Sequence, residues 1–246
     1  MKLIPSDRAP GLWVSPGVTI PDDVEIAPHV TIYDGVTIGP GSSVGQGSIL
    51  GRPQQIDVRS RSPRQPRGAP TVIGFGCMIG SYTVIVAGSC VGDGTYVGDH
   101  ALVRETARIG RDTMIGRGCI ISHSTEIHDR VRLQAEAVVA PWTVLGEAVE
   151  VGLRVTFLGD ATLGRRPPGP SPDGGIRVGA GARIGAGAII LPPVTIGEEA
   201  FVGAAALVRR DVEARTVVVG TPAIFLRAVQ DHELMTAWRN EQMAGA

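Results

Sequence analysis

The 246-residue chain is poor in aromatic side chains, which make up 4% of it, and it contains a single lysine and a single asparagine. So few rings exclude a core built mainly of large aromatic side chains. The apolar residues are mostly valine, isoleucine, leucine and alanine, and they occur with 34 glycines. This composition favours short β-branched strands separated by tight turns over a packed helical core.

Net charge and long apolar runs are also lacking. The formal net charge is −1, so no overall basic field points to nucleic acid. No apolar stretch is long enough to span a bilayer, and Met1 to Pro10 lacks the apolar run of a signal peptide. The three cysteines, Cys77, Cys90 and Cys119, form no Cys-x-x-Cys pair and no even-numbered framework. We therefore expect a cytoplasmic protein with free thiols that binds neither nucleic acid nor membrane.

What the sequence does contain is a period of six. An aliphatic residue, or Phe157 at the end of the second block, returns at every sixth position from Val14 to Leu50, from Ile73 to Phe157 and from Val178 to Val208. Such a period fits neither an α-helix nor a simple half-buried strand. It fits short strands with one inward side chain each, and glycine where the turn needs a positive φ. Three units make a coil of about 18 residues, and coils stack about 4.8 Å apart. The prediction is an all-β parallel β-helix of roughly nine or ten coils.

Two insertions interrupt the period, at about 52–70 and 160–175. Long loops on a rigid scaffold often carry binding residues, although either loop could be a solvated excursion. The arginines that could meet phosphate or carboxylate groups there are Arg52, Arg59, Arg61, Arg64, Arg67, Arg165 and Arg166. We expect the β-helix to occupy 1–223 and the segment 224–246 to be helical. A helix from about Ile224 to about Asn240 would cover the last coil.

Three motifs give the chain a family resemblance. They are Gly51-Arg52-Pro53-Gln54, Ile121-Ser122-His123-Ser124-Thr125-Glu126-Ile127 and Val219-Gly220-Thr221-Pro222-Ala223. With the period, they make the chain from Val14 to Arg227 resemble the left-handed β-helix acyltransferases. Within that superfamily it is similar to bacterial sugar N-acetyltransferases and to UDP-N-acetylglucosamine O-acyltransferases. The left hand comes from this resemblance, since the general rule for parallel crossovers predicts the opposite.

The resemblance implies a function. It implies an acyl-coenzyme A-dependent transferase, with acetyl-CoA as the donor and no metal. The acceptor would be an amine or hydroxyl of a small molecule, most simply a nucleotide-linked amino sugar. A homotrimer with sites between subunits is also implied, although the outward positions mix charged and apolar residues without an obvious continuous patch. The segment after Ala223 is shorter than the helical C-terminal domain of the UDP-N-acetylglucosamine O-acyltransferases, which act in lipid A synthesis. This favours a small acyl group over a fatty one.

His123 is the candidate catalytic base, because a neutral imidazole suits proton removal near pH 7. In relatives an acidic residue often follows this histidine, and here Ser124 does. Glu105 lies 18 residues earlier and should stack about 4.8 Å away, one coil below. We expect its carboxylate to accept the far ring N–H, fix the tautomer and stabilise the imidazolium.

The coenzyme A donor is expected along the C-terminal coils. The small residues Gly185, Gly187, Gly203 and Ala205 would let an extended pantetheine arm approach the backbone. We expect the phosphates to be bound by Arg209, Arg210 and Arg227. Asp160, which begins the second insertion, is a candidate acceptor contact.

Two other interpretations remain open at this point. His123 and His128 have the spacing of hexapeptide-repeat carbonic anhydrases, and with His100 they could hold zinc. The fold also serves as a non-catalytic assembly platform. The remaining histidines, His29 and His232, are expected to be ordinary surface residues.

Overall fold

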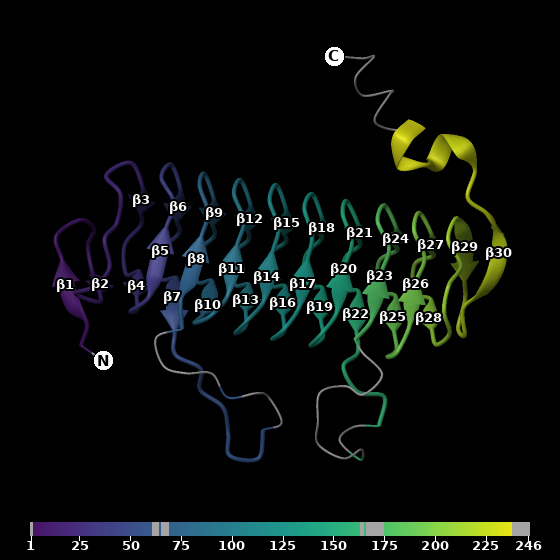
Figure 1. Ribbon diagram of the computed structural model, residues 1–246, viewed down its shortest axis with the longest axis horizontal. Helices are drawn as coiled ribbons and strands as arrows, with labels where there is room; N and C mark the ends of the chain where they lie inside the picture. The colour runs from purple at the N-terminus through teal and green to yellow at the C-terminus, as the bar shows by residue number, and fades with distance from the viewer. Residues whose placement is uncertain (1, 61–63, 65–68, 163–164, 166–174, 238–246) are drawn as a thin grey trace.

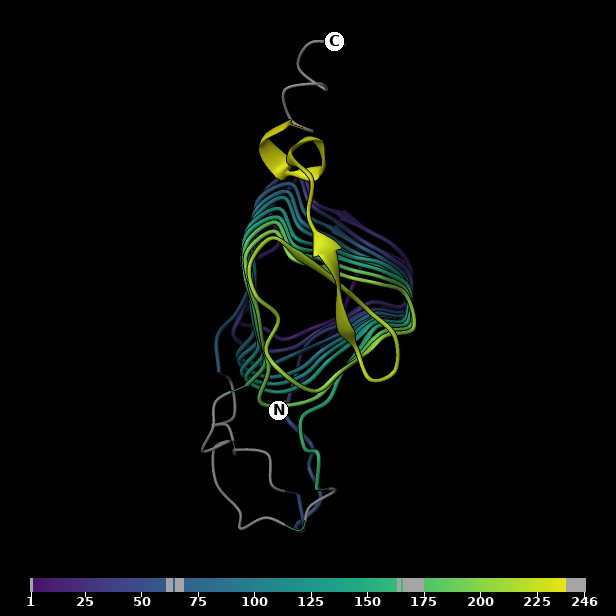
Figure 2. The ribbon, with the colours of Figure 1, turned by 90° about the vertical axis from the view of Figure 1, so that its right-hand side faces the viewer.

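The computed structural model describes residues 2–60, 64, 69–162, 165 and 175–237. The chain winds as a solenoid whose coils stack along one long axis (Figure 1) and enclose a triangular prism when viewed along it (Figure 2). Each regular coil contributes one short strand to each of three sheets. The predicted parallel β-helix of hexapeptide repeats is confirmed.

The three sheets are named A, B and C. Sheet A contains β1 (Ile4–Ser6), β2 (Leu12–Val14), β4 (Thr31–Ile32), β7 (Ile49–Arg52), β10 (Val84–Val86), β13 (Leu102–Val103), β16 (Ile120–Ile121), β19 (Val138–Val139), β22 (Thr156–Phe157), β25 (Ile189–Ile190) and β28 (Leu207–Val208). Sheet C contains β5 (Val36–Ile38), β8 (Thr71–Ile73), β11 (Cys90–Val91), β14 (Arg108–Ile109), β17 (Glu126–Ile127), β20 (Val144–Leu145), β23 (Arg177–Val178) and β26 (Thr195–Ile196). Sheet B contains β3 (Glu25–Ile26), β6 (Ser43–Val44), β9 (Met78–Ile79), β12 (Tyr96–Val97), β15 (Met114–Ile115), β18 (Arg132–Leu133), β21 (Glu150–Val151), β24 (Arg183–Ile184), β27 (Phe201–Val202), β29 (Thr216–Val219) and β30 (Ile224–Ala228).

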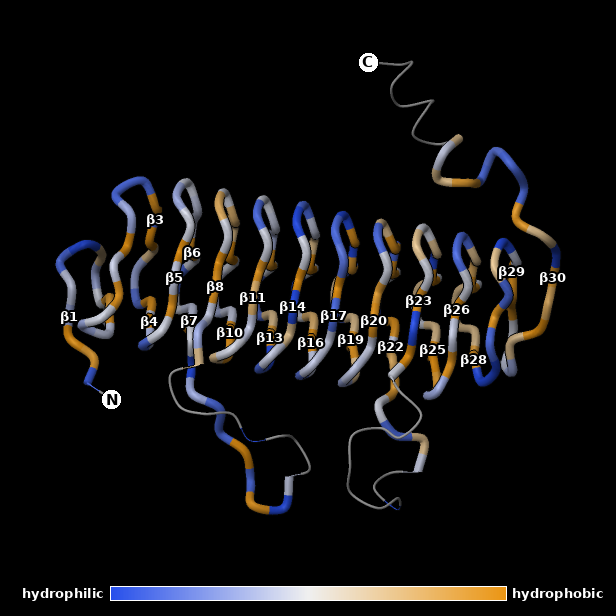
Figure 3. The backbone as a smooth tube through the Cα atoms, in the orientation of Figure 1, coloured by the Kyte–Doolittle hydropathy of each residue, from blue (hydrophilic) through white to orange (hydrophobic). Residues whose placement is uncertain are grey.

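Successive coils repeat in register. Leu102 pairs with Ile120, and Ile120 pairs with Val138, at a spacing of 18 residues. The aliphatic residue of each strand points inward, so Ile121 and Leu133 are fully buried. Figure 3 shows the resulting pattern, in which apolar stretches recur along the coils between more polar ones. The core is therefore built from stacked columns of these side chains, together with buried residues two positions before them such as Ala107 and Cys119.

The chain passes from sheet A to sheet C, then to sheet B, then back to A. We call the three turns the AC, CB and BA corners. Both insertions leave at the AC corner, the first between β7 and β8 and the second between β22 and β23. Figure 1 shows the described residues of both insertions on the same side of the solenoid. Arg61, Arg67 and Arg166 lie outside the described residues.

Glycine is required after the aliphatic positions for a different reason from the positive φ that was expected. Gly92 does not have a positive φ; the positive φ belongs to Gly94, at +66°. A Cβ on Gly92 would lie 2.6 Å from the carbonyl carbon of Gly110 in the next coil. Glycine is present there because the backbones of successive coils approach closely.

The C-terminal helix expected from Ile224 is wrong in its first part. Ile224–Ala228 forms strand β30, which pairs antiparallel with β29. It is followed by a short 3-10 helix, η1 (Asp231–Glu233), and by helical residues 235–237, while 238–246 lies outside the described residues. The open edge of β29 presents backbone groups that a strand can pair and a helix cannot, which explains the difference. At the other end of the solenoid, β1 pairs antiparallel with β2.

The outward columns of the three sheets differ in charge. Apart from Arg52, which ends β7 and pairs with Val86, the register-paired outward residues of sheet A are uncharged and mostly apolar: Trp13, Thr31, Ile49, Val84, Leu102, Ile120, Val138, Thr156, Ile189 and Leu207. The same columns of sheets B and C include charged residues such as Arg132, Glu150, Arg108 and Glu126. Sorted by sheet, the outward positions therefore do form one continuous uncharged face, contrary to expectation.

No helix among the described residues is long and apolar enough to cross a membrane.

Candidate active site

His123 lies at the AC corner, directly after β16 (Ile120–Ile121) and between the two inserted loops. Its coil register places it above Glu105, as predicted. Both side chains are almost fully buried, with 3% of His123 and 1% of Glu105 exposed. The ring of Trp142, from the next coil, meets the imidazole edge-on, with 4.8 Å between centroids and 89° between planes. Trp142 thus packs against the imidazole from the next coil, while Glu105 occupies the equivalent position in the coil before.

The carboxylate of Glu105 is bound by other partners than the one expected. Arg104 donates to both of its oxygens, at 2.6 and 3.2 Å, and Gln54 of the first insertion donates from Nε2 at 2.9 Å. His123 makes no hydrogen bond to it; Nδ1 of the imidazole lies 3.3 Å from Ser124 Oγ. The structure describes both residues and has no hydrogen bond between them, so this prediction is wrong. The guanidinium of the adjacent Arg104 binds the Glu105 carboxylate instead.

Electrostatics nevertheless connect the two groups. Burial lowers the pKa of His123 below its ordinary value, and the charge of Arg104 lowers it further, while the charge of Glu105 raises it. The imidazole is therefore held neutral, which is the form that can accept a proton. Nε2 makes no hydrogen bond to any residue in the described part of the chain and is the free nitrogen of the ring.

The residues predicted to bind the donor are distributed over different parts of the solenoid. Arg209 and Arg210 follow β28 at the AC corner, on the same edge as His123, and line a pocket with Ile224 and Phe225. Arg227, on β30, is engaged by Glu233 at 2.6 and 3.0 Å, and this bond lowers the pKa of that carboxyl to about 2.

The small residues lie elsewhere. Gly185, Gly187, Gly203 and Ala205 follow sheet B strands and lie at the BA corner. A Cβ on Gly185 would be 2.4 Å from the Ala204 nitrogen, so this glycine also permits the next coil to stack. Within one chain these residues are on a different edge from His123.

Asp160 is where the second insertion leaves the AC corner. Its carboxylate accepts hydrogen bonds from the backbone N–H and the hydroxyl of Thr162, both at 2.6 Å. The side chain is half-buried and lies one coil beyond Trp142 by register.

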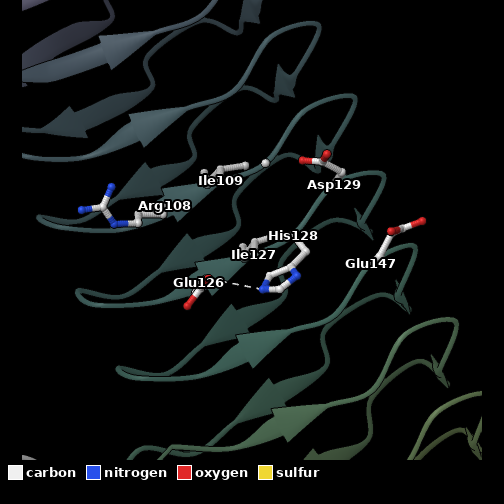
Figure 4. Close-up of a pocket in the computed structure, with 8 residues that line it drawn as sticks. Arg108, Ile109, Glu126, Ile127, His128, Asp129 and Glu147 are labelled. Atoms are coloured by element: carbon white, nitrogen blue, oxygen red, sulfur yellow. Dashed lines mark ion pairs between the residues drawn. The ribbon is translucent and has the colours of Figure 1, made fainter.

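The three histidines considered for zinc lie on three different corners. His123 is at the AC corner, His128 at the CB corner and His100 at the BA corner, stacked on Tyr82 with ring centroids 5.4 Å apart. Figure 4 shows His128 in its own pocket, paired with Glu126 at 3.3 Å. Among the described residues, no group of three or more His, Cys, Asp or Glu side chains is arranged to hold a metal ion.

Sequence reasoning missed four residues that contact His123, Ser124 or Glu105, or act on them electrostatically. The residues not assigned to the site from the sequence are Gln54, Arg104, Thr106 and Trp142. Thr106 and Trp142 could have been found from the coil spacing alone, because each lies 18 residues from Ser124. Arg104 and Gln54 reach the site through side-chain direction and loop conformation, which the period does not determine.

Comparison with known proteins identifies the family to which the chain belongs. The "bacterial transferase hexapeptide (six repeats)" family matches residues 17–52, 70–105 and 175–210, and the "hexapeptide repeat of succinyl-transferase" family matches 106–141. Together these stretches make up more than half of the chain. The chain belongs to the hexapeptide-repeat transferase superfamily. The 106–141 match includes His123 and its hydroxyl neighbours.

Individual relatives match over parts of the chain. Serine acetyltransferase 2 of Arabidopsis thaliana is 33% identical over 101 residues, which are 40% of this chain and 30% of that protein. The crystal structure of Neisseria gonorrhoeae serine acetyltransferase with serine is 27% identical, covers 42% of this chain and 40% of its own, and has a TM-score of 0.36. A variant of AntD, an N-acyltransferase from Bacillus cereus in complex with dTDP and coenzyme A, is 22% identical over 64% of this chain and 91% of its own, with a TM-score of 0.42. The chain thus spans less than half the length of the two serine acetyltransferases.

Proposed function

We propose that this protein transfers a small acyl group, most simply acetyl, from coenzyme A to an amine or hydroxyl of a small acceptor. The observation that carries the proposal is a buried, neutral imidazole whose Nε2 is free, on the same edge of the solenoid as Arg209 and Arg210. The partial sequence match to a serine acetyltransferase supports acyl transfer as the chemistry. His123 would remove the proton of the attacking nucleophile as the tetrahedral intermediate forms.

The column that contains His123 supports coenzyme A as the donor. By register, His123 is followed in successive coils by Pro141, Gly159, Pro192 and Arg210. Four coil steps at the usual strand spacing place Arg210 about 19 Å from His123. A donor that reaches both His123 and Arg210 would therefore be long and extended, with its reactive carbonyl at one end and its anionic groups at the other. An acyl-pantetheine joined to phosphates has this form, and Arg209 and Arg210 would bind the phosphates.

The acceptor would approach between the two inserted loops. Gln54 brings the first loop to Glu105, while Asp160 anchors the start of the second. The face of Trp142 and the arginines of the loops suit a ring joined to an anion. A nucleotide-linked amino sugar is the proposed acceptor.

The uncharged face of sheet A supports a homotrimer. A column of uncharged, mostly apolar outward residues running along the solenoid suits a buried interface, and His123 lies at its edge. A neighbouring copy packed on this face would form the second wall of the site. The BA corner of such a copy, with Gly185 and Gly203, would then be able to meet the donor.

Substitution of His123 tests the function. His123→Ala should lower kcat by about two to four orders of magnitude, the usual range for loss of a general base. Calorimetric titration with acetyl-CoA should show saturable binding that is unchanged in His123→Ala. The double change Arg209→Ala and Arg210→Ala should weaken this binding instead. Absence of acetyl-CoA binding by the wild-type protein at millimolar concentration would overturn the proposal.

A further inference from the structure

A continuous row of hydrogen-bonding atoms leads from His123 to the preceding coil. His123 Nδ1 lies 3.3 Å from Ser124 Oγ. Ser124 Oγ lies 3.2 Å from Thr106 Oγ1, and the Thr106 hydroxyl donates to the backbone carbonyl of Glu105 at 2.6 Å. The backbone N–H of Ser124 also donates to Thr106 Oγ1, at 3.1 Å. Neither hydroxyl belongs to the acid–base machinery described so far.

The direction of this row is determined at its far end. A carbonyl oxygen only accepts, so the single proton of the Thr106 hydroxyl is used in the bond to Glu105. The Ser124 hydroxyl must then be the donor in its contact with Thr106. Its own proton being used, Ser124 Oγ can only accept from the imidazole, so Nδ1 of His123 carries the proton. Nε2 is left with the lone pair.

The backbone at Thr106 gives independent support. Thr106 has a φ of +58°, in the left-handed region that β-branched residues strongly disfavour. Among the non-glycine residues of positive φ in the described part of the chain, it is the only β-branched one. The equivalent residue one coil earlier is Gly88, which has a φ of +88° without steric penalty. A strained threonine at a position that accepts glycine suggests that its hydroxyl is needed.

We propose that Thr106 and Ser124 are positioning residues that fix the Nδ1–H tautomer of His123 through this hydroxyl row. The inference rests on the proposed role of His123 as the base. It gives Ser124 and Thr106 the task first expected of Glu105, with a neutral backbone carbonyl as the final acceptor. When Nε2 takes the proton from the nucleophile, Nδ1 keeps its own proton and continues to donate to Ser124.

The tautomer can be observed without any acyl transfer. In protein labelled with ¹⁵N-histidine, at a pH where His123 is neutral, the two ring nitrogens give separate shifts that report which one is protonated. His123→Ala identifies the signals. Wild-type protein should show Nδ1 protonated. In Thr106→Val the Ser124 proton is freed to point at Nδ1, and in Ser124→Ala the acceptor is lost, so both variants should populate the Nε2–H form.

Matched controls separate this role from a structural one. Thr106→Ser keeps the hydroxyl and should keep the wild-type tautomer, whereas Thr106→Val keeps only the shape. Thr106→Val and Ser124→Ala should lower kcat about three- to tenfold, the scale of one hydrogen bond, with unchanged acetyl-CoA affinity. Protonated Nε2 in the wild type, or an unchanged tautomer in both variants, would refute the hydroxyl row. If the protein transfers no acyl group, the histidine spectrum still decides the tautomer, so the two failures are distinguishable.

Discussion

The pKa of His123 is affected by two opposite charges, those of Arg104 and Glu105, which form an ion pair with each other. Arg104 lowers the pKa of the imidazole and Glu105 raises it, while burial adds to the lowering. Since the base acts when neutral and its pKa is lowered, the decline of kcat/KM on the acidic side should begin at a lower pH than an ordinary histidine would give.

Removal of either charge should shift the acidic limb of the profile of kcat/KM against pH, and the sign of the charge determines the direction. Glu105→Gln removes the group that favours the imidazolium, so the pKa of His123 falls further and the limb shifts to lower pH. Arg104→Gln removes a repelling cation, so the pKa rises and the limb shifts to higher pH. Profiles of kcat/KM against pH for the two variants check both signs.

Arg104→Lys is the control for this pair, because it retains the cation and should leave the limb near its wild-type position. Shifts in the same direction for Glu105→Gln and Arg104→Gln would contradict the electrostatic account. In that case disturbance of the buried Arg104–Glu105 contact, rather than charge, would control the imidazole.

At the scale of the turn, two kinds of glycine have different energetic roles. Gly92 faces the backbone of the next coil, while Gly76 has a φ of +62° and no atom within 4 Å of the point where a Cβ would lie. Gly92→Ala should destabilise the protein by about 3 kcal/mol, the upper part of the range for overpacked sites. Gly76→Ala should cost about 1 kcal/mol or less, because left-handed strain is partly offset by the lower entropy of the unfolded chain. Urea unfolding midpoints compare the two, and equal losses would show that coil contact is unimportant.

The six-residue period was sufficient to predict the coils, the inward residues, the positions of both insertions and the stacking of His123 on Glu105. These features depend only on how many residues separate one coil from the next. The period could not predict that Ile224–Ala228 would pair with β29, because the apolar spacing there suits a helix and the open strand edge decides otherwise. Nor could it predict the bond between Arg104 and Glu105, since neighbouring side chains at a turn meet through rotamers that no spacing encodes.

At the scale of the whole molecule, the uncharged face of sheet A predicts the assembly. Ile120→Arg places a charge in the middle of that face, where a neighbouring copy would have to bury it. Light scattering should show a trimer for the wild type and a monomer for this variant at micromolar concentration. Met78→Arg, an equally outward position on sheet B, is the matched control and should remain trimeric. A monomeric wild type would rule out a site shared between subunits.

The antiparallel strands at the two ends have a consequence for growth along the solenoid axis. Parallel coils offer the same unpaired edge at each end that amyloid fibrils use to recruit further chains. Here β1 reverses direction against β2 at the start of sheet A, and β30 does so against β29 at the end of sheet B. A second molecule adding end-to-end would have to match parallel edges and reversed edges at once. The protein should therefore resist filament formation even at high concentration, and a variant that lacks both β1 and the residues from Ile224 onward should polymerise.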